Sequence, residues 1–344
     1  MHPLPSEPTP SRILLIRLKS IGDILFTLPA VHALRDNFPY AKISFLTTNQ
    51  NAPLLRGFRE VNEVIALNRA ALQKPFRAAS EIFRLLQRLR SESFSLIVDL
   101  QGYGETAWLS WLSGAAERWG SVYSGGREWL YTRGIRRDDT LQIADWNLSL
   151  LRQCGLKIGE IRNEFVLPAD ALAEAEKVFA ENNLNPSKPT LFFQPFTSSP
   201  QKNWPLENYL ALARYFQSRG VQIIFSGGPA DRAALEPARA ASFVVSAAAP
   251  LLVSAGLAKL SSVTVGGVTG LLHLAVAMQK RVVMLIGPAG EPGFPYQHRD
   301  WGLTPVAGDN VADIRVLAVI DACAKALAEM SVVSGQESRY LTSR

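Results

Sequence analysis

Short apolar runs alternate with amphipathic segments along the first half of the chain. The runs that predict strands are RILLIRL (12–18), AKISFLTT (41–48), VNEVIAL (61–67) and FSLIVDLQG (94–102). Helical patterns lie between and after them, at the segment that ends near Phe38, at FRAASEIFRLLQRLR (76–90) and at WNLSLLRQCG (146–155). Strands that are separated by helices predict a parallel sheet with helices on both faces.

The second half repeats this alternation. A segment rich in good helix formers covers 169–182, and NLNPSKP (183–189) has the composition of a linker. The next strands are expected at TLFFQ (190–194), VQIIFS (221–226), SVTVGG (262–267) and RVVMLIG (281–287). Helices are expected at 205–219, 269–279 and 311–330. The chain therefore predicts an α/β protein with two doubly wound parallel sheets, one in each half.

The pattern also predicts the domain boundaries. They are a flexible lead-in at 1–11, a first Rossmann-like domain at 12–168, a linker helix and loop at 169–189, a second Rossmann-like domain at 190–330 and a flexible tail at 331–344. Ligands of open α/β sheets bind beyond the carboxyl ends of the strands. We therefore expect the loops that follow strands to line a central cleft between the two domains.

Composition is that of a soluble globular protein, since 47% of the 344 residues are hydrophobic and 19% are charged. No apolar run approaches the roughly 20 residues that cross a bilayer. The opening MHPLPSEPTPSR lacks the basic and apolar parts of a signal peptide. Cys154 and Cys323 fit no metal or redox spacing. These features favour a cytoplasmic protein and predict neither a metal site nor a cofactor.

The formal net charge is +6, and part of it lies on the helical segment 76–90. Its arginines are Arg77, Arg84, Arg88 and Arg90, and leucines supply an apolar side. One interpretation is a solvated helix, and the other is peripheral contact with an anionic membrane surface. Nucleic acid is not expected as a partner, because the basic residues are not interleaved with aromatic ones.

Three loops in the second half are rich in small or hydroxylated residues. They are PFTSSPQKNWP (195–205), SGGPAD (226–231) and GGVTG (266–270), and each follows a predicted strand. A helix start offers unpaired N–H groups and partial positive charge, which suits a phosphate, and Lys202 adds a full charge. Together the loops favour a diphosphate site, although glycine and serine also populate turns for conformational reasons.

The segment LKSIGDILFTLPA (18–30) places Asp23 at the start of a helix, directly after the first strand. Ser20-x-x-Asp23 fits a capping box, in which the carboxylate would serve only the helix. The same carboxylate lies at the carboxyl end of a strand and could also take a proton from a substrate. Pro29, which lacks a backbone donor, is expected to kink the helix.

These segments resemble the lipopolysaccharide heptosyltransferases, glycosyltransferase family nine. The resemblance covers roughly residues 12 to 325 and rests on ILLIRLKSIGDILFTLPAVHALRDNFPYAKISFLT, SLIVDLQG, SGAAERWG, TSSPQKNWPLENY and TGLLHLAVAMQKRVVMLIGP. It implies a metal-independent, inverting enzyme of the GT-B type. Such an enzyme moves a heptose from ADP-heptose to a lipid-linked core oligosaccharide at the inner face of the cytoplasmic membrane.

The resemblance also implies roles for individual residues. Asp23 matches the general base, and Lys202 matches the group that stabilises the leaving diphosphate. Acceptor contacts are expected from Lys19, Ser20 and Gly22. Donor contacts are expected from Thr197, Ser198, Lys202, Gly227, Asp231, Thr269, Gly270, Leu271 and His273. From the residues alone, His273 could equally be a packed histidine and Thr269 a simple helix cap.

One position departs from the family pattern. The family usually has Asp-Thr-Gly at the last of these loops, and this chain has Val268-Thr269-Gly270. The alternative function is therefore a nucleotide-sugar-binding protein with an altered donor or with lost transfer activity. A nucleotide-sugar epimerase of the GT-B type is a third hypothesis. Release of ADP only when an acceptor is present would distinguish a transferase from both.

Overall fold

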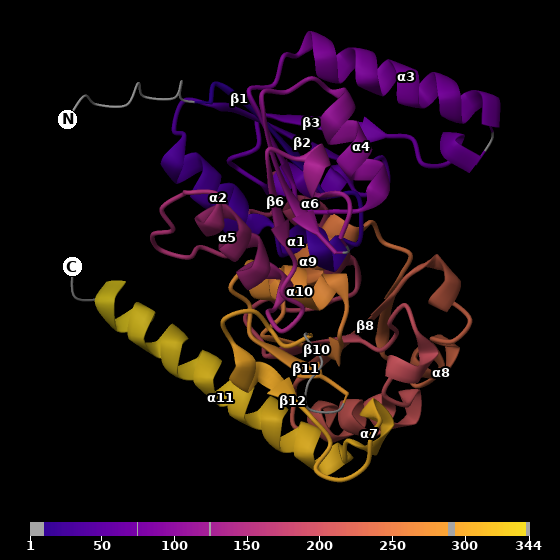
Figure 1. Ribbon diagram of the computed structural model, residues 1–344. Coiled ribbons are helices and arrows are strands. Elements are labelled where there is room, and N and C mark those ends of the chain that lie inside the picture. Colours follow the sequence, from indigo (N-terminus) through magenta and orange to yellow (C-terminus); the bar gives the residue numbers. More distant parts are fainter. Residues whose placement is uncertain (1–9, 74, 124, 288–292, 342–344) are drawn as a thin grey trace. The chain divides into compact units, whose positions relative to one another are not determined.

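The chain forms two compact units, Met1–Val166 and Leu167–Arg344. A computed structural model describes the backbone of residues 10–73, 75–123, 125–287 and 293–341, and the side chains of these residues except 75–77 and 331–341. Each unit is built around one sheet of six described strands (Figure 1). None of the described helices is both long and apolar enough to cross a membrane.

The first sheet has the strand order β3-β2-β1-β4-β5-β6, and every neighbouring pair is parallel. Its strands are β1 (Arg12–Ile16), β2 (Lys42–Thr48), β3 (Glu63–Leu67), β4 (Leu96–Asp99), β5 (Glu117–Val122) and β6 (Arg133–Arg136). The central strands are short apolar runs, and β1 is buried from Ile13 to Ile16. Burial of apolar side chains on both faces is what a helix-covered parallel sheet requires.

Helices cover the two faces of this sheet. They are α1 (Ile21–Leu25), α2 (Leu28–Asn37), α3 (Pro75–Ser91), α4 (Gly104–Leu112) and α5 (Ile143–Gln153). Helices α2 and α5 pack together, on the side of the sheet away from α3 and α4 (Figure 1). On the other face, Leu85 and Leu89 of α3 join the core that contains Leu14 and Ile16 of β1.

Pro29 interrupts the helix that follows the first strand. The sequence predicts one kinked helix, and the structure instead has two helices, α1 and α2, separated at Phe26 and Thr27. Pro29 lies in the first turn of α2, where its missing N–H costs no hydrogen bond. The break leaves α1 as a short helix of five residues that carries Asp23 in its first turn.

The second sheet has the order β12-β11-β10-β7-β8-β9, again with parallel neighbours. Its strands are β7 (Thr190–Gln194), β8 (Gln222–Gly227), β9 (Val244–Ala247), β10 (Val263–Gly267), β11 (Val282–Leu285) and β12 (Gly302–Leu303). If the strands of each sheet are numbered from one in chain order, both sheets have the order 3-2-1-4-5-6. This is the doubly wound order found in dinucleotide-binding folds.

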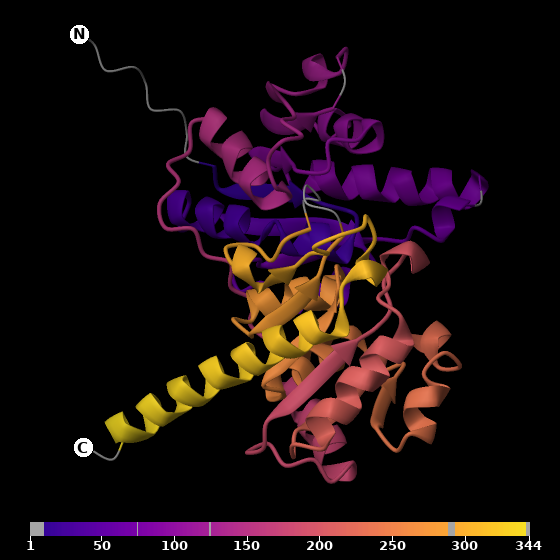
Figure 2. The same ribbon diagram turned by 90° about the horizontal axis from the view of Figure 1, so that it is seen from below.

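The helices of the second unit also form two layers. They are α6 (Ala169–Glu181), α7 (Leu206–Gln217), α8 (Glu236–Ala240), α9 (Leu251–Leu260), α10 (Gly270–Ala277) and α11 (Val316–Leu341). Helix α11 packs against α7 (Figure 2), and α6 packs against α9. Gly256 allows this last contact, because a Cβ there would lie 2.5 Å from the Cβ of Ala175. The predicted linker helix, 169–182, is thus part of the second unit's packing.

Several expected elements are shifted, and four strands, β5, β6, β9 and β12, were not expected. The first strand ends at Ile16, so Arg17 and Leu18 belong to the following loop. Strands β5 and β6 lie in segments that contain glycine and arginine and show no apolar run, and the segment of β9 has a run of only three apolar residues, 243–245, before Ser246. These three strands lie toward the β6 and β9 edges of their sheets, where burial demands less hydrophobicity.

Candidate functional site

The reversal of strand order in each sheet locates a candidate site. In the first sheet, β1 and β4 lie side by side although β2 and β3 intervene in the chain, and in the second sheet β7 and β10 do the same. Ligands of open α/β sheets bind at this switch point, beyond the carboxyl ends of the strands. The predicted acceptor residues follow β1, and the predicted donor residues follow β7, β8 and β10.

Asp23 is held by two groups at the switch point of the first sheet. Its Oδ2 accepts a hydrogen bond of 2.9 Å from the Ser20 N–H and forms an ion pair of 2.9 Å with Nη2 of Arg17. The Arg17 side chain is 4% exposed, whereas that of Asp23 is 27% exposed. Oδ1 accepts no hydrogen bond from a described residue. The carboxylate therefore caps its helix through one oxygen and can present the other to a ligand.

The loop around Asp23 is fixed by residues that follow β4. Nη1 of Arg17 donates to the Leu100 carbonyl, and the N–H of Leu18 donates to Oε1 of Gln101 at 3.1 Å. Asn51 adds a bond of 3.0 Å from its Nδ2 to the Leu18 carbonyl. Gln101 is 1% exposed. From the sequence, Arg17 was expected to help bind an anionic acceptor or to belong to the strand, and its pairing with Asp23 was not predicted. Gln101 was not singled out, although both residues lie in segments that carry the family resemblance.

Asp99, at the end of β4, organises that second loop. Its Oδ1 accepts the N–H groups of Gln101 and Gly102 at 3.0 and 2.9 Å, and its Oδ2 accepts the Tyr131 hydroxyl at 2.7 Å. Burial raises the pKa of the Asp99 carboxyl, while these hydrogen bonds lower it, and the net direction is upward. Asp99 thus supports the loop that positions Arg17, and it is fully buried.

The three predicted acceptor residues lie on the exposed side of this loop. Ser20 is exposed, and Lys19 and Gly22 are half-buried. Nζ of Lys19 lies 5.6 Å from the centre of the Tyr103 ring, a cation–π distance. Tyr103 follows β4 and contacts Tyr123, which follows β5. The structure therefore places a lysine and two aromatic rings beside Asp23 at one edge of the sheet.

Arg137, which follows β6, extends this basic and aromatic edge. Its guanidinium lies 5.1 Å from the Tyr123 ring centre and pairs with Asp139 at 2.8 Å. Nη1 of Arg137 is buried and has no hydrogen-bond partner among the described residues. A buried donor without a protein partner is open to a water molecule or an ion. Arg137 was not expected at this edge, because β6 itself was not expected.

In the second unit, the loop after β7 is folded tightly on itself. The N–H of Thr197 donates to Oδ1 of Asn203 at 2.8 Å, and Oγ1 of Thr197 donates to the Ser199 carbonyl at 2.8 Å. Ser198 is exposed. The loop packs on β10 at Gly267, where a Cβ would lie 2.7 Å from Cγ2 of Thr197. The hydroxyl of Thr197 is thus engaged locally, and the glycine permits the close approach.

The loop after β10 opens directly into α10. Oγ1 of Thr269 accepts from the Leu272 N–H at 3.3 Å, so Thr269 is the helix cap that its position suggested. Among the described residues, the N–H groups of Gly270 and Leu271 donate to no acceptor. The side chains of Leu271 and His273 are buried. This helix start has the free backbone donors that an anion requires.

The loop after β8 is closed by Asp231. Its Oδ2 accepts the Gly228 N–H at 2.8 Å, which forms a single turn over η5 (Pro229–Asp231). Gly227 is buried, and a Cβ at this position would lie 2.9 Å from Cβ of Asp231. The glycine is therefore required for the turn. Asp231 remains half-buried at the carboxyl end of β8, next to the switch point.

A pocket of about 200 Å³ joins these elements within the second unit. Its lining residues are Gln201, Lys202, Val268, Leu285, Gly287, Asp309, Asn310 and Val311. The structure thus brings Lys202, from the loop after β7, to the same pocket as the turn that precedes Thr269. Asp309 and Asn310 were not expected, because they lie in a polar loop (306–310) with no motif.

The architecture is that of the GT-B class of glycosyltransferases. A crystal structure of the glycosyl transferase family 9 from Veillonella parvula DSM 2008 matches with a TM-score of 0.84, at 19% identity, over 93% of this chain and 98% of that chain. The Escherichia coli heptosyltransferase WaaC solved with ADP matches with a TM-score of 0.74, at 19% identity, over 92% and 99%. At such identities the likeness concerns the fold.

The chain belongs to glycosyltransferase family 9, the heptosyltransferase family, whose model matches residues 82–302. Lipopolysaccharide heptosyltransferase 1 of Pseudomonas aeruginosa is 28% identical over 295 residues, which is 82% of this chain and 80% of that protein. Lipopolysaccharide heptosyltransferase 2 of Escherichia coli is 26% identical over 316 residues, 84% and 86% of the two chains. The protein is a glycosyltransferase, as the family resemblance predicted.

Proposed function

We propose that this glycosyltransferase moves a heptose from ADP-heptose to a lipid-linked core oligosaccharide of lipopolysaccharide, with inversion and without a metal ion. Relatives described as lipopolysaccharide heptosyltransferases support the reaction. A structural neighbour solved with ADP-2-deoxy-2-fluoro heptose supports the donor. The observation that carries the proposal is the half-exposed carboxylate of Asp23 at the switch point of the first sheet, held through one oxygen only.

Asp23 is the general base of the proposed reaction. Because Arg17 and the Ser20 N–H occupy Oδ2, the proton of the attacking acceptor hydroxyl goes to Oδ1. The hydroxyl oxygen forms a bond to the anomeric carbon on the face opposite the diphosphate, and the bond from that carbon to the diphosphate oxygen breaks. Attack from the opposite face inverts the anomeric centre. A positioned base of this kind contributes about 10²- to 10⁴-fold to the rate.

Lys202 and the start of α10 stabilise the leaving ADP. The departing oxygen takes the bonding electron pair, so negative charge grows on the diphosphate. The ammonium group of Lys202 and the N–H groups of Gly270 and Leu271 supply the compensating positive charge. In this proposal they do the work that a divalent cation does in other transferases. Thr197, Ser198, Gly227, Asp231, Thr269 and His273 belong to the proposed donor site.

The acceptor binds the first domain, proposed as residues 12–168, and the donor binds the second, proposed as 190–330. Lys19, Ser20 and Gly22 contact the acceptor, and Arg137 adds a buried cation at the same edge of the first sheet. Aromatic rings at Tyr103 and Tyr123 suit sugar faces. This combination of cations and rings supports an anionic sugar as the acceptor.

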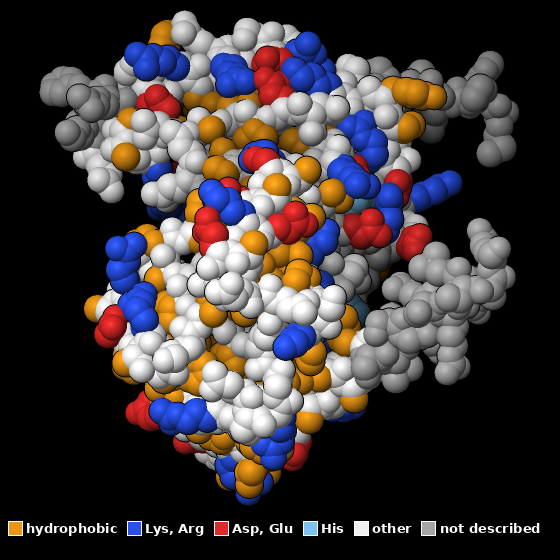
Figure 3. Space-filling view, turned by 180° about the vertical axis from the view of Figure 1, so that it is seen from behind, with side chains coloured by type: hydrophobic (Ala, Val, Ile, Leu, Met, Phe, Trp, Pro, Cys, Tyr) orange, Lys and Arg blue, Asp and Glu red, His pale blue; other side chains and the backbone are white. Residues whose placement is uncertain are grey.

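A cytoplasmic location with peripheral contact at the inner face of the membrane is also part of the proposal. Two arginines of α3 are engaged within the unit, since Arg88 pairs with Glu63 at 2.6 Å and Nε of Arg90 donates to the Leu112 carbonyl at 2.9 Å. Arg77 lies outside the described side chains. Figure 3 displays basic and acidic side chains interspersed over one face. Because part of the basic charge of α3 is engaged within the unit, the proposed contact with a membrane relies on apolar side chains as well as on the remaining charge.

Release of ADP by purified protein tests the proposal. The protein is incubated with ADP-heptose, with and without a heptose-deficient lipopolysaccharide core, in the presence and absence of EDTA. We expect ADP release only with the acceptor, an unchanged rate in EDTA, and a product with the inverted anomeric configuration by NMR. Release without acceptor would favour an epimerase or a hydrolase. Donor binding without any release would favour the alternative that Val268 suggests, a binding protein.

A further inference from the structure

A pocket of the first unit adjoins the loop that carries Asp23 and shares Leu18 and Lys19 with that loop, but Asp23 does not line it. It has a volume of about 270 Å³ and lies between η2 (Ala71–Gln73), α3 and α4. The lining residues are Leu18, Lys19, Thr48, Leu67, Arg69, Leu72, Ile82, Leu85, Glu105, Trp108, Leu109 and Leu112. Eight of these twelve side chains are aliphatic or aromatic, so the pocket favours a hydrocarbon over a sugar or a nucleotide.

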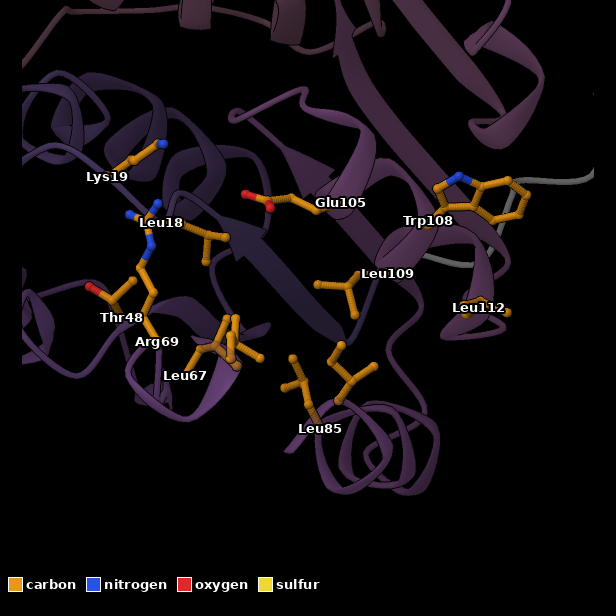
Figure 4. Close-up of a pocket in the computed structure, with 12 residues that line it drawn as sticks. Leu18, Lys19, Thr48, Leu67, Arg69, Leu85, Glu105, Trp108, Leu109 and Leu112 are labelled. Carbon is orange, nitrogen blue, oxygen red and sulfur yellow. The ribbon is translucent and has the colours of Figure 1, made fainter. Parts of the chain in front are cut away.

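Polar and apolar groups are separated within this pocket. In Figure 4, Leu67, Leu85 and Leu109 surround the space, and the charged ends of Lys19 and Arg69 lie to one side of it. Leu67 and Leu85 are buried, whereas Arg69 is exposed. Such a pocket suits a ligand with one apolar and one charged end. An apolar cavity offers water few hydrogen-bond partners, so replacement of water by a hydrocarbon chain is favourable.

The charge at the polar side favours an anion. Lys19 and Arg69 contribute two cations, and Glu105 contributes the one carboxylate among the lining residues. The charged lining residues therefore have a net charge of +1, which favours an anionic headgroup next to the apolar part of the pocket. The short helix α1 and Asp23 are not among the lining residues, so occupancy of the pocket does not require the catalytic carboxylate.

Exposed rings and apolar side chains flank the pocket. Trp108 lines it and also contacts Trp111 and Trp129, with ring centres 5.7 and 5.6 Å apart. These three indoles are 46%, 42% and 58% exposed, and Phe83 on the outer side of α3 is 61% exposed. Contiguous exposed apolar groups mark interaction sites, and tryptophans are enriched where protein meets the headgroup region of a bilayer.

We propose that this pocket binds one alkyl chain of an anionic membrane lipid. The chain inserts among Leu67, Leu85 and Leu109, and the headgroup phosphate lies at Lys19 and Arg69. The tryptophan cluster Trp108, Trp111 and Trp129 contacts the surrounding lipid. This site adds a lipid ligand to the nucleotide sugar and the acceptor of the proposed function, and it stands whether or not Asp23 is the base.

The first test measures binding of n-alkyl phosphates to the purified full-length protein by calorimetry, below their critical micelle concentrations and without nucleotide. We expect each methylene removed from dodecyl phosphate to weaken binding by about fourfold, and longer chains to reach a plateau when the pocket is full. Dodecyltrimethylammonium should bind more weakly than dodecyl phosphate. Affinity that does not depend on chain length, or equal binding of the cation, would overturn the proposal.

Variants of the pocket make the test specific. Leu109→Asp, which puts a carboxylate among the leucines, should weaken dodecyl phosphate binding by more than about tenfold. Leu112→Trp fills the space without a charge and should also weaken it, which guards against misfolding of the first variant. Leu317→Asp is the matched control, since Leu317 is 71% exposed on α11. Equal binding by both pocket variants and the control would refute the site.

Charge and membrane source are tested in two further arms. Arg69→Ala should weaken dodecyl phosphate binding roughly two- to fivefold and leave dodecanol binding unchanged, whereas Arg152→Ala on α5 should change neither. Cosedimentation with phosphatidylglycerol vesicles should be strong for the wild type and lost in Leu109→Asp. Vesicle binding that Leu109→Asp retains would refute a membrane lipid as the occupant. None of these measurements involves transfer, so failure of the proposed function is detected separately.

Discussion

Replacement of Asp23 by asparagine separates the two roles of this carboxylate. Asparagine has the same shape and can still accept the Ser20 N–H through its amide oxygen, so the start of α1 keeps its cap. It cannot take a proton from a hydroxyl at neutral pH. The variant therefore removes the base and the negative charge while it preserves the helix cap.

The magnitude of each effect follows from the geometry. Breaking a fully buried ion pair costs about 3–5 kcal/mol, but the Asp23 side chain is 27% exposed and solvent screens the pair. We therefore expect a loss of about 1–2 kcal/mol in the free energy of unfolding. Loss of the general base should lower turnover by about 10²- to 10⁴-fold, equivalent to about 3–5 kcal/mol in the activation barrier. The change in the activation barrier should therefore exceed the change in the free energy of unfolding.

The assay compares acceptor-dependent ADP release, ADP affinity by calorimetry and unfolding in urea for the same preparations. Asp36→Asn is the matched control, because Asp36 pairs with Arg162 at the surface of the same unit and is 50% exposed. We expect the control to keep full turnover and Asp23→Asn to keep ADP affinity. Turnover of Asp23→Asn within threefold of the wild type would exclude Asp23 as the base.

Three further predictions concern the donor loops and pH. Lys202→Ala should weaken ADP binding by about tenfold, as loss of a charge-assisted hydrogen bond does. The control Lys188→Ala should leave ADP binding unchanged. Equal affinities of the wild type and Lys202→Ala by calorimetry would exclude the role of Lys202. Gly267→Ala should weaken ADP binding, because its Cβ would lie 2.7 Å from Thr197 and 3.1 Å from the Lys202 carbonyl, whereas Gly125→Ala, which meets nothing within 4 Å, should leave it unchanged. Burial raises the pKa of Glu60 but its bond to His32 lowers it, to a net value below the ordinary 4.5. Stability from Glu60 is therefore present above pH 4.5 and lost as the pH falls through the lowered value. The difference in urea midpoint between wild type and Glu60→Gln should shrink there, and a constant difference from neutral to acid pH would contradict this.

Much of the fold was predictable because its central strands are buried on both faces. Strands β1, β2, β7 and β10 are short apolar runs bounded by turn residues, and each was expected within two residues of its observed ends. Strands β5 and β6 were not, because a sequence such as ERWGSV carries polar side chains and a glycine in place of an apolar run. Gly120 in β5 is needed because the ring of Tyr131 lies against it, a tertiary contact that no local pattern encodes.

The residues of the candidate site likewise fall into those with a local sequence signal and those that only the fold brings together. The capping roles of Thr269 and Asp23 were predictable because a cap and an acidic residue at a helix start leave a local signal, whereas their roles in binding and catalysis stay predictions. Arg17 was expected within the strand at 12–18 but lies in the loop after β1. Its pairing with Asp23 was not predicted, because its guanidinium is positioned by the carbonyl of Leu100, which is 83 residues away. Asn310 and Arg137 come from segments whose positions depend on the sheets, so only the assembled fold brings Asn310 to the pocket of Lys202 and Arg137 to the ring of Tyr123.

In the proposed reaction the two units use one topology for two kinds of chemistry, and the loop after the first strand of each accounts for the difference. After β1, a buried arginine and a backbone N–H hold one oxygen of Asp23, so this switch point presents the carboxylate that we propose as the base. After β7, the loop folds on Gly267 and brings Lys202 to the pocket that Val268 lines, so this switch point offers cationic and backbone donors. A base on one substrate and positive charge for the other's leaving group are the two requirements of a displacement at a sugar. Valine at position 268 replaces the aspartate of the family pattern in the same pocket as Lys202, so acceptor-dependent release of ADP decides between transfer and the alternative of a nucleotide-sugar-binding protein.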